Sequence, residues 1–326
     1  MINLAVIGRN FVVDEMLEAT RLFPEIKLCA IYSRNKETGR DYADKWGFDR
    51  VYTDLDKMAS DKDIDAVYIA SPNCCHEQQA VKLLSAGKHV LCEKPMHKTH
   101  TGAVNMINTA RDNNVVFMEA MMSAHVPGTY KIMELLPRIG KVRRVDLSFC
   151  QYSSRYDKFK KGIVENAFDP TLWNGAFMDM GVYPVSLMLQ LFGEPSDIKS
   201  EAVFLPNSID GQGTMICSYP DMTATLQWSK ITQGYLPSDI QGEDGSIIID
   251  RVSKPTNLTL VLRDGTREEY ETLGGKPVMY YELRDFIAQI KGEKMPQFNA
   301  LSEAEAALME KARKQMGINF SLTQEK

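Results

Sequence analysis

The stretch of the chain that most clearly offers chemistry is a short apolar run that ends in a charged turn. Residues 89–92 lead directly into Glu93, Lys94 and Pro95. Open α/β sheets bind their ligands at the carboxyl ends of the strands, so a lysine that follows a buried strand is well placed to meet a ligand. The structural alternative is a surface lysine at the entrance of a loop.

A glycine turn after the first apolar run predicts a nucleotide site. Residues 4–7 run into Gly8-Arg9-Asn10-Phe11-Val12-Val13. A complete dinucleotide fingerprint has glycine at the first, third and sixth positions of such a turn, and here only Gly8 is kept. Asparagine tolerates positive φ well, so we expect Asn10 to preserve the turn, while Val13 predicts a looser helix–strand contact. We interpret Gly8, Arg9, Asn10 and Phe11 as cofactor-binding residues.

The end of the second apolar run favours NADP over NAD as the cofactor. NAD-binding folds carry an acidic residue here for the ribose 2′-hydroxyl, whereas an arginine accommodates the 2′-phosphate of NADP. The chain has Ser33 and Arg34 at this point, and no acid. A hydroxyl and a planar, forked cation suit a phosphate. NAD is the alternative cofactor, with Arg34 as a solvated loop residue.

Polar residues also follow the third apolar run, in the sequence Ser71-Pro72-Asn73-Cys74-Cys75-His76. Asn73 and His76 bracket the predicted start of a helix, which is both an N-cap setting and a loop that can face a dinucleotide. We interpret Ser71, Pro72, Asn73 and His76 as cofactor-binding residues. Helix capping is the structural alternative for Asn73 and His76.

The elements that must position these residues alternate along the first part of the chain. Short apolar strands separated by amphipathic helices indicate βαβ units and a parallel sheet. The pattern therefore predicts an α/β architecture with an N-terminal Rossmann, doubly wound parallel sheet. The predicted strands are 4–7, 27–32, 65–70, 89–92 and 115–118, and the predicted helices are 14–23, 35–46, 76–86 and 101–113.

The pattern changes near residues 122–128. A long alternating strand at 142–152 and hairpin signals between 198 and 270 predict a mostly antiparallel sheet, with turns at 219–222 and 263–266. The predicted helices of this part are 131–136, 179–192, 278–290 and 302–315. We therefore place a dinucleotide-binding Rossmann domain at 1–122 and an α+β domain at 123–326.

Composition excludes several classes of protein. The 326 residues carry a net charge of −5 with both signs interspersed, so the chain has no basic stripe for nucleic acid. Residues 1–8 lack the basic region of a signal peptide, and no apolar run is long enough to span a membrane. The six cysteines and five histidines show no metal-ligand spacing, which argues against a zinc hydrolase and predicts no metal. We expect reduced thiols in a cytoplasmic protein.

The chain resembles the glucose–fructose oxidoreductase, inositol dehydrogenase and MocA (Gfo/Idh/MocA) family over essentially its whole length. The most specific mark is Gly87-Lys88-His89-Val90 followed by Glu93-Lys94-Pro95. The other marks are the Gly8 turn, Ser71-Pro72-Asn73 with His76, Met118-Glu119-Ala120, and Asn174-Gly175-Ala176-Phe177-Met178-Asp179-Met180-Gly181-Val182-Tyr183-Pro184.

The resemblance implies reversible hydride transfer between NAD(P) and a sugar, polyol or related diol. It implies that an open-faced sheet in the second domain binds a small-molecule substrate and joins subunits into a homodimer or higher homo-oligomer. It also implies that Glu93, Lys94 and Glu119 contact the cofactor. The sequence also offers four candidate substrate contacts, which are Arg155, Tyr156, Asn166 and Trp173. For each of them, a packing role or an ordinary surface position is the alternative.

Tyr183 distinguishes this chain from many members of the family, which carry histidine at that position. The tyrosine form is similar to the glucose–fructose oxidoreductase and dimeric dihydrodiol dehydrogenase branches. Those branches tend to have an arginine and aromatic residues after the fifth strand, whereas residues 121–127 here lack that arginine. The substrates of those branches therefore cannot be transferred to this chain.

Alcohol oxidation needs a base for the hydroxyl proton, and Tyr183 can serve only if its pKa falls from about 10 toward neutrality. A lysine ammonium at about 4 Å favours the phenolate by about 4 kcal/mol in an effective dielectric of about 20, so the arithmetic permits Lys94 to assist. Asp179 lies four residues before Tyr183, on the same face of a helix. Asp179 would orient the substrate hydroxyl or tune Lys94, with helix N-capping as the alternative.

Two other interpretations stay open. One is a reductase that acts on an imine or on a carbonyl outside sugars. The other is a non-catalytic NAD(P)-binding sensor or regulatory protein, which the eroded glycine fingerprint favours. The joint presence of Lys94, Asp179 and Tyr183 argues against the sensor, because a pure binding protein has no need of a phenol four residues from a carboxylate.

Overall fold

The computed structural model describes residues 1–320, which divide into two compact units. The first unit combines Met1–Ala120 with Met279–Glu303, and the second begins with Met121–Val278 and continues from Ala304. The chain therefore returns to its first unit after building most of the second. The predicted division into domains at 1–122 and 123–326 has a single boundary and does not include that return.

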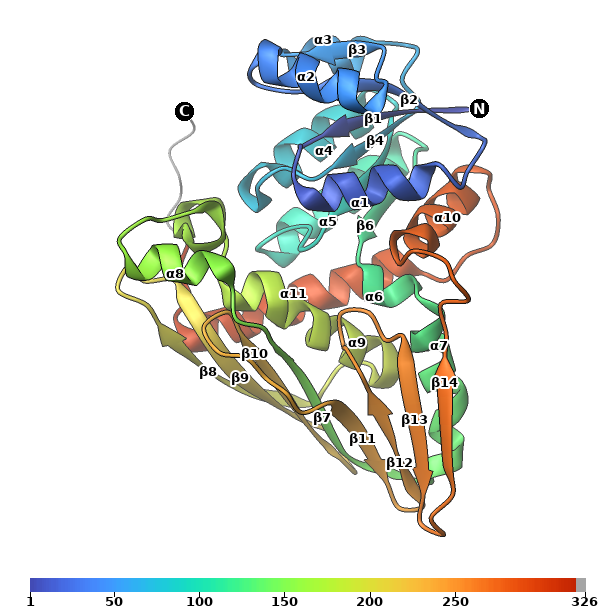
Figure 1. The fold of residues 1–326 in the computed structure, drawn as a ribbon, viewed down its shortest axis with the longest axis vertical. Helices are drawn as coiled ribbons and strands as arrows, with labels where there is room; N and C mark the ends of the chain where they lie inside the picture. Colours follow the sequence, from blue (N-terminus) through green and yellow to red (C-terminus); the bar gives the residue numbers. More distant parts are fainter. Residues whose placement is uncertain (321–326) are drawn as a thin grey trace. The chain divides into compact units, whose positions relative to one another are not determined.

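The first unit is built on a parallel sheet of six strands within the described residues, in the order β3-β2-β1-β4-β5-β6 (Figure 1). This is the strand order of the doubly wound dinucleotide-binding fold. All neighbouring pairs are parallel, and the central strand β4 is buried along its whole length. The strands are β1 (Ile2–Ile7), β2 (Ile26–Tyr32), β3 (Arg50–Tyr52), β4 (Ala66–Ile69), β5 (His89–Glu93) and β6 (Phe117–Ala120).

Helices connect these strands and pack in pairs, with α4 beside α5 and α1 beside α10. Several begin and end at the residues that local chemistry favours: Asn35 caps α2 through a bond from the Thr38 amide, and Gly47 ends it in the left-handed region. The helices are α1 (Phe11–Thr20), α2 (Lys36–Trp46), α3 (Leu55–Ser60), α4 (His76–Ser85), α5 (His100–Asp112) and α10 (Met279–Ile290).

The structure differs from the sequence-based prediction in three places in the first unit. The helix expected at 14–23 begins earlier, at Phe11, and the strand expected at 115–118 is shifted toward the carboxyl end, to Phe117–Ala120. The short elements β3 and α3, of three and six residues, were not predicted, because segments this short show no readable apolar period.

The second unit is built on a sheet of eight strands within the described residues, in the order β14-β13-β12-β11-β7-β10-β9-β8. Only β7 and β10 pair in parallel, so the predicted mostly antiparallel sheet is confirmed. The strands are β7 (Val142–Cys150), β8 (Asp197–Phe204), β9 (Asp210–Ser218), β10 (Thr223–Ser229), β11 (Ser238–Gly242), β12 (Gly245–Ile249), β13 (Asn257–Leu262) and β14 (Arg267–Glu271).

Side chains of this sheet alternate between a buried and an exposed face, as the period of two requires. Helix α9 (Val182–Phe192) packs against β7 and β10, and the Ser200 hydroxyl of β8 donates to the Ala312 carbonyl of α11 (Phe298–Met316). The remaining elements are α6 (Met122–His125), α7 (Pro127–Leu135), η2 (Leu136–Ile139), α8 (Ser154–Lys160), η3 (Asn166–Phe168), η4 (Pro170–Leu172) and the π-helical turn η5 (Phe177–Gly181).

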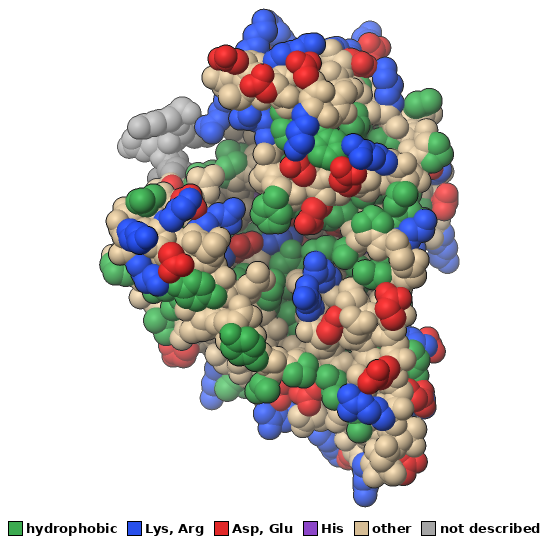
Figure 2. All heavy atoms as spheres, in the orientation of Figure 1, with side chains coloured by type: hydrophobic (Ala, Val, Ile, Leu, Met, Phe, Trp, Pro, Cys, Tyr) green, Lys and Arg blue, Asp and Glu red, His purple; other side chains and the backbone are tan. Residues whose placement is uncertain are grey.

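Charged side chains of both signs are interspersed on the face of the molecule drawn in Figure 2, as the sequence indicates. None of the helices within residues 1–320 is long and apolar enough to cross a membrane.

Candidate functional site

The turn after β1 is shaped by Gly8. Its φ is +119°, and a Cβ added there would lie 2.6 Å from the Ala70 carbonyl oxygen, so only glycine fits. The expectation for Asn10 was wrong, because its φ is −93° and Gly8 alone supplies the positive φ. Asn10 instead caps α1, accepting a bond from the Val13 amide at 3.1 Å. The close turn and the helix start form a cradle of the kind that binds a pyrophosphate.

Residues after β2 place a cation at the carboxyl ends of the strands, where the Gly8 turn also lies. Arg34 is exposed, whereas Ser33 is 4% exposed and its hydroxyl donates to the Asn35 carbonyl at 2.7 Å. Arg9 is also exposed and its guanidinium donates to the Thr38 carbonyl at 3.0 Å. Arg34 is therefore the more accessible group for an anion, and Ser33 supports the backbone of the loop.

The loop after β4 contains a fully buried imidazole. The 3₁₀ turn η1 (Asn73–Cys75) precedes α4, whose N-cap residue is Cys75, so Asn73 is not the helix cap. The ring nitrogens of His76 lie 3.1 Å from the Pro95 carbonyl oxygen and 3.0 Å from that of Ser71. Burial lowers the pKa of His76 to about 4, so the ring is neutral near pH 7. His76 therefore joins two loops at this edge of the sheet.

Lys94 follows β5 directly and is half-buried. The preceding carboxylate, Glu93, accepts a bond from the Tyr68 hydroxyl at 2.5 Å. Two residues after Lys94, the Met96 amide donates to Glu119 Oε1 at 2.8 Å. Glu119 is 2% exposed.

Burial raises the pKa of Glu119 to about 7. The Ser302 hydroxyl, the Met96 amide and the Lys94 charge oppose that shift, and the Glu93 carboxylate adds to it. The turn after β5 is consequently surrounded by buried acids.

Because the six strands are parallel, the residues after them meet at one edge of the sheet. The predicted cofactor-binding residues of the first unit lie at or near the carboxyl ends of β-strands, in the loops that follow them, or at the first residue of the next helix, as Phe11 and His76 do. These are Gly8, Arg9, Asn10, Phe11, Ser33, Arg34, Ser71, Pro72, Asn73, His76, Glu93, Lys94 and Glu119. Phe11 is 61% exposed, which leaves its ring available to a ligand.

In the second unit, Asp179 lies in the π-helical turn η5 and pairs with a lysine that sequence reasoning missed. Lys230 Nζ lies 2.8 Å from Asp179 Oδ2 and donates to the Ala167 carbonyl at 3.2 Å. Lys230 is 3% exposed, while the Asp179 side chain is 44% exposed. The capping alternative for Asp179 was wrong, because the residue sits inside a continuous helical segment. Single π turns occur often at functional sites.

A second buried carboxyl, Asp210, lies under the same turn. Its Oδ2 accepts the Phe177 amide at 2.6 Å, and Asp210 is 1% exposed. Burial raises its pKa to about 6, against the lowering effect of the Phe177 amide and the Lys230 charge. Lys230 could have been suspected from the sequence, because it follows an apolar strand as Lys94 does.

Tyr183 is the second residue of α9 and is 8% exposed. Its ring packs edge-to-face on Phe149 of β7, with centroids 5.5 Å apart and planes at 71°. This contact holds the phenol by its apolar body and fixes the ring orientation.

The four candidate substrate residues lie on one segment between β7 and η5. Tyr156 of α8 stacks on Phe168, whose ring lies 5.8 Å from Lys230 Nζ. Trp173 follows η4 with φ of +57°, an unusual backbone region for an aromatic residue. Asn166 is exposed and its carbonyl accepts the Asn174 amide. Arg155 is exposed, 3.7 Å from Glu165, so the structure gives it a surface ion pair.

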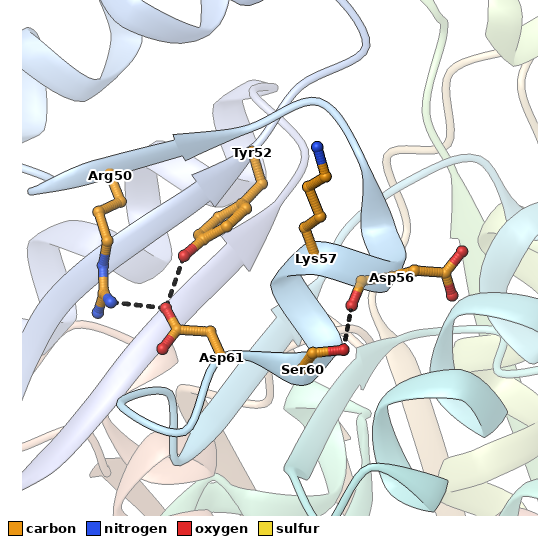
Figure 3. Close-up of a pocket in the computed structure, with 6 residues that line it drawn as sticks. All are labelled: Arg50, Tyr52, Asp56, Lys57, Ser60 and Asp61. Carbon is orange, nitrogen blue, oxygen red and sulfur yellow. Dashed lines mark hydrogen bonds and ion pairs between the residues drawn. The ribbon is translucent and has the colours of Figure 1, made fainter.

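A separate pocket of about 490 Å³ lies beside β3 and α3 (Figure 3). Its polar groups satisfy one another: the Tyr52 hydroxyl and an Arg50 nitrogen both lie 2.6 Å from Asp61 Oδ2. None of the predicted site residues lines it. Among residues 1–320, no group of three or more His, Cys, Asp or Glu side chains is arranged to hold a metal ion.

Comparison with known proteins identifies relatives of the whole chain. It is 43% identical to scyllo-inositol 2-dehydrogenase (NADP(+)) IolU of Bacillus subtilis, over 99% of this chain and 100% of that protein. It is 25% identical to trans-1,2-dihydrobenzene-1,2-diol dehydrogenase of Mus musculus, over 91% of this chain and 90% of that one.

Solved structures agree on the fold. The 3-ketoreductase KijD10 of Actinomadura kijaniata, solved with NADP and TDP-benzene, superposes with a TM-score of 0.84 at 22% identity, over 97% of this chain and 98% of that one. Residues 2–121 match the Gfo/Idh/MocA oxidoreductase family with its NAD-binding Rossmann fold, and residues 137–248 match the C-terminal domain of that family. The chain thus belongs to the Gfo/Idh/MocA family of NAD(P)-dependent oxidoreductases.

Proposed function

We propose that this protein is an NADP-dependent dehydrogenase that interconverts a secondary hydroxyl of a polyol or cyclic diol and the corresponding ketone. The observation that carries the proposal is full-length similarity to an NADP-dependent scyllo-inositol 2-dehydrogenase at 43% identity. The mouse relative, named for oxidation of a cyclic diol, supports the same class of substrate.

The residues of the first unit fit a dinucleotide. The close approach of Gly8 to Ala70 leaves room only for backbone beside the start of α1, where a pyrophosphate would be bound by amide groups. Exposed Arg34, in place of an acid after β2, would bind the 2′-phosphate of NADP. Hydride acceptance and donation are the chemistry that bound NADP supplies.

The chain's own residues move the proton. In the direction of oxidation, the phenolate of Tyr183 takes the proton of the substrate hydroxyl, and in reduction the phenol returns it. The Lys94 ammonium favours the phenolate and binds the substrate oxygen. Asp179, held by Lys230, accepts a hydrogen bond from a substrate hydroxyl and thereby orients it.

The cofactor choice is tested by titrating NADPH and NADH into the wild-type protein and two arginine variants. We expect Arg34→Ala to weaken NADPH binding by about tenfold to a hundredfold, because a charge-assisted bond is lost, and to change NADH binding little. Arg40→Ala is the matched control, since Arg40 is an exposed arginine of α2 paired with Asp44. Equal loss in both variants would contradict the assignment of Arg34.

The reaction is tested with a panel of inositols, sugars and cyclic diols, followed by absorbance of the reduced cofactor. Tyr183→Phe should lower kcat by about 10²-fold or more with folding intact, because the Phe149 contact is kept. Tyr219→Phe is the control, since Tyr219 donates to the Gly193 carbonyl at 2.8 Å in the same unit. Tight cofactor binding without turnover on the panel would favour a sensor instead.

A further inference from the structure

Three polar side chains from three different elements hold the turn that contains Lys94. The Tyr68 hydroxyl of β4 donates to Glu93 Oε1 at 2.5 Å, immediately before the lysine. A ring nitrogen of His76, at the start of α4, lies 3.1 Å from the Pro95 carbonyl oxygen, immediately after it.

Glu119 of β6 makes the third contact, because its Oε1 accepts the Met96 amide at 2.8 Å. The contacts of His76 and Glu119 constrain the backbone after Lys94, and the Tyr68 bond holds the Glu93 side chain before it.

The three side chains are among the most buried polar groups of the first unit. Tyr68 and His76 are 0% exposed and Glu119 is 2% exposed. Burying such groups is unfavourable unless they are hydrogen-bonded, and their bonds are stronger in a low-dielectric interior than in water. The second ring nitrogen of His76 lies 3.0 Å from the Ser71 carbonyl oxygen, so the ring sits between the loop after β4 and the turn after β5.

Electrostatics sets the protonation state of Tyr68 and His76. Burial raises the pKa of Tyr68 well above its usual value, helped by the Glu93 and Glu282 carboxylates, so the phenol stays a donor. Burial lowers the pKa of His76 to about 4, so the neutral ring has one N–H to donate and bonds one of its two carbonyls at a time.

We propose that Tyr68, His76 and Glu119 are positioning residues that fix the turn after β5 so that the Lys94 ammonium is held in one place. The inference rests on the proposed role of Lys94 in the reaction. A lysine has a long, flexible stem, so a fixed backbone is what limits the volume its ammonium explores. A displacement of about 1 Å at a reacting group can reduce a rate about 10²-fold.

The first test measures the turn without using activity. Hydrogen exchange of the Met96 amide, followed by NMR, should become about tenfold faster or more in Glu119→Ala, because its acceptor is lost. Glu119→Gln keeps a side-chain carbonyl oxygen and should restore the protection of Met96. Asp65→Ala is the matched control, since Asp65 Oδ2 accepts the Asn3 amide at 2.8 Å at the opposite edge of the same sheet. Unchanged exchange of Met96 in Glu119→Ala overturns the proposal.

The second test measures catalysis by the full-length enzyme with NADP. Tyr68→Phe should lower kcat about tenfold or more and shift the pH–rate profile, because Glu93 loses its donor immediately before Lys94. Tyr52→Phe is the control, since the Tyr52 hydroxyl makes an equivalent bond to Asp61 beside β3 (Figure 3). Equal kinetic effects of Tyr68→Phe and Tyr52→Phe overturn the positioning role.

The two proposals fail in different ways. If Lys94→Ala lowers the rate but Tyr68→Phe and Glu119→Ala do not, the positioning role is overturned and the proposed reaction stands. If Lys94→Ala leaves the rate unchanged, the role of Lys94 is overturned, and the positioning inference, which rests on it, falls with it even where Met96 exchange responds to Glu119→Ala.

Discussion

Two lysines follow buried strands in this protein, and the structure treats them differently. Lys94 follows β5 in the first unit and is half-buried in a turn that neighbouring polar side chains constrain. Lys230 follows β10 in the second unit, is 3% exposed and pairs with Asp179. The same local pattern therefore produces a buried lysine in an ion pair in one unit and, in our proposal, an ammonium group that assists proton transfer in the other.

The acids around the two lysines differ as well. Near β5, burial raises the pKa values of Glu119 and Glu282, and the Glu93 charge raises them further. Under η5, burial raises the pKa of Asp210 to about 6, and the Lys230 charge acts in the opposite direction. A lysine charge lowers the pKa of a buried acid in both units, Lys94 acting on Glu119 and Lys230 on Asp210, and near β5 the Glu93 carboxylate additionally raises the pKa of the buried acids. The comparison shows that the role of a strand-end lysine depends on which carboxyl groups the fold brings to it.

The largest expected effect separates the two lysines by kinetics. Lys94→Ala should lower kcat about 10²-fold or more and move the pH–rate profile, with little change in the urea midpoint. Lys230→Met should lower the urea midpoint and leave the pH–rate profile nearly unchanged, because the buried Lys230 ammonium is committed to its ion pair with Asp179. A pH–rate profile that responds to Lys230→Met and not to Lys94→Ala would reverse the comparison.

A smaller effect tests how the buried ion pair is balanced. Asp179→Ala leaves the Lys230 ammonium buried without its carboxylate and should reduce the free energy of unfolding by about 3 kcal/mol. Lys230→Met leaves Asp179, whose side chain is 44% exposed, in contact with water and should cost only about 1 kcal/mol. Urea unfolding of both variants measures the difference. Equal losses in the free energy of unfolding would mean that the burial of Lys230 does not determine which partner of the ion pair costs more to remove.

The smallest effect concerns the acids near β5. Glu282 is 1% exposed, and burial together with the Glu93, Asp285 and Glu15 carboxylates raises its pKa well above the usual 4.5. The folded state therefore keeps the proton to higher pH than the unfolded chain does. The stabilisation is complete below the unfolded pKa and is lost as the pH rises toward the folded one, by up to about 1.4 kcal/mol per pH unit.

Glu282→Gln should remove that pH dependence, because glutamine does not ionise. Urea unfolding at a series of pH values should show the variant gaining stability relative to the wild type as the pH rises above the unfolded value of 4.5. The control is Glu201→Gln, at an exposed position of β8. Parallel pH curves for the wild type and Glu282→Gln would show that Glu282 does not carry the dependence.

Most of the fold could be predicted from local signals. Apolar runs in the first unit identified β1, β2, β4 and β5, and the turns at 219–222 and 263–266 identified two hairpins that the strand pairing confirms. β3 and α3 were missed because they are too short to show an apolar period. Asn10 was assigned to the right turn for the wrong reason, since its side chain caps α1 instead of replacing a glycine.

By itself, the sequence determined that Gly8, Arg34, His76 and Lys94 follow parallel strands, because the alternation of strands and helices along the chain and the chemistry of the turns are local properties that follow from residue type and spacing. Only the tertiary structure decided which polar side chains meet. Asp179 and Lys230 are far apart in the chain and pair because η5 packs on β10. His76 and Glu119 meet the turn after β5 because the fold brings α4 and β6 beside β5, and Glu119 also bonds the Ser302 hydroxyl. Such pairings depend on distances between elements, which no local pattern contains.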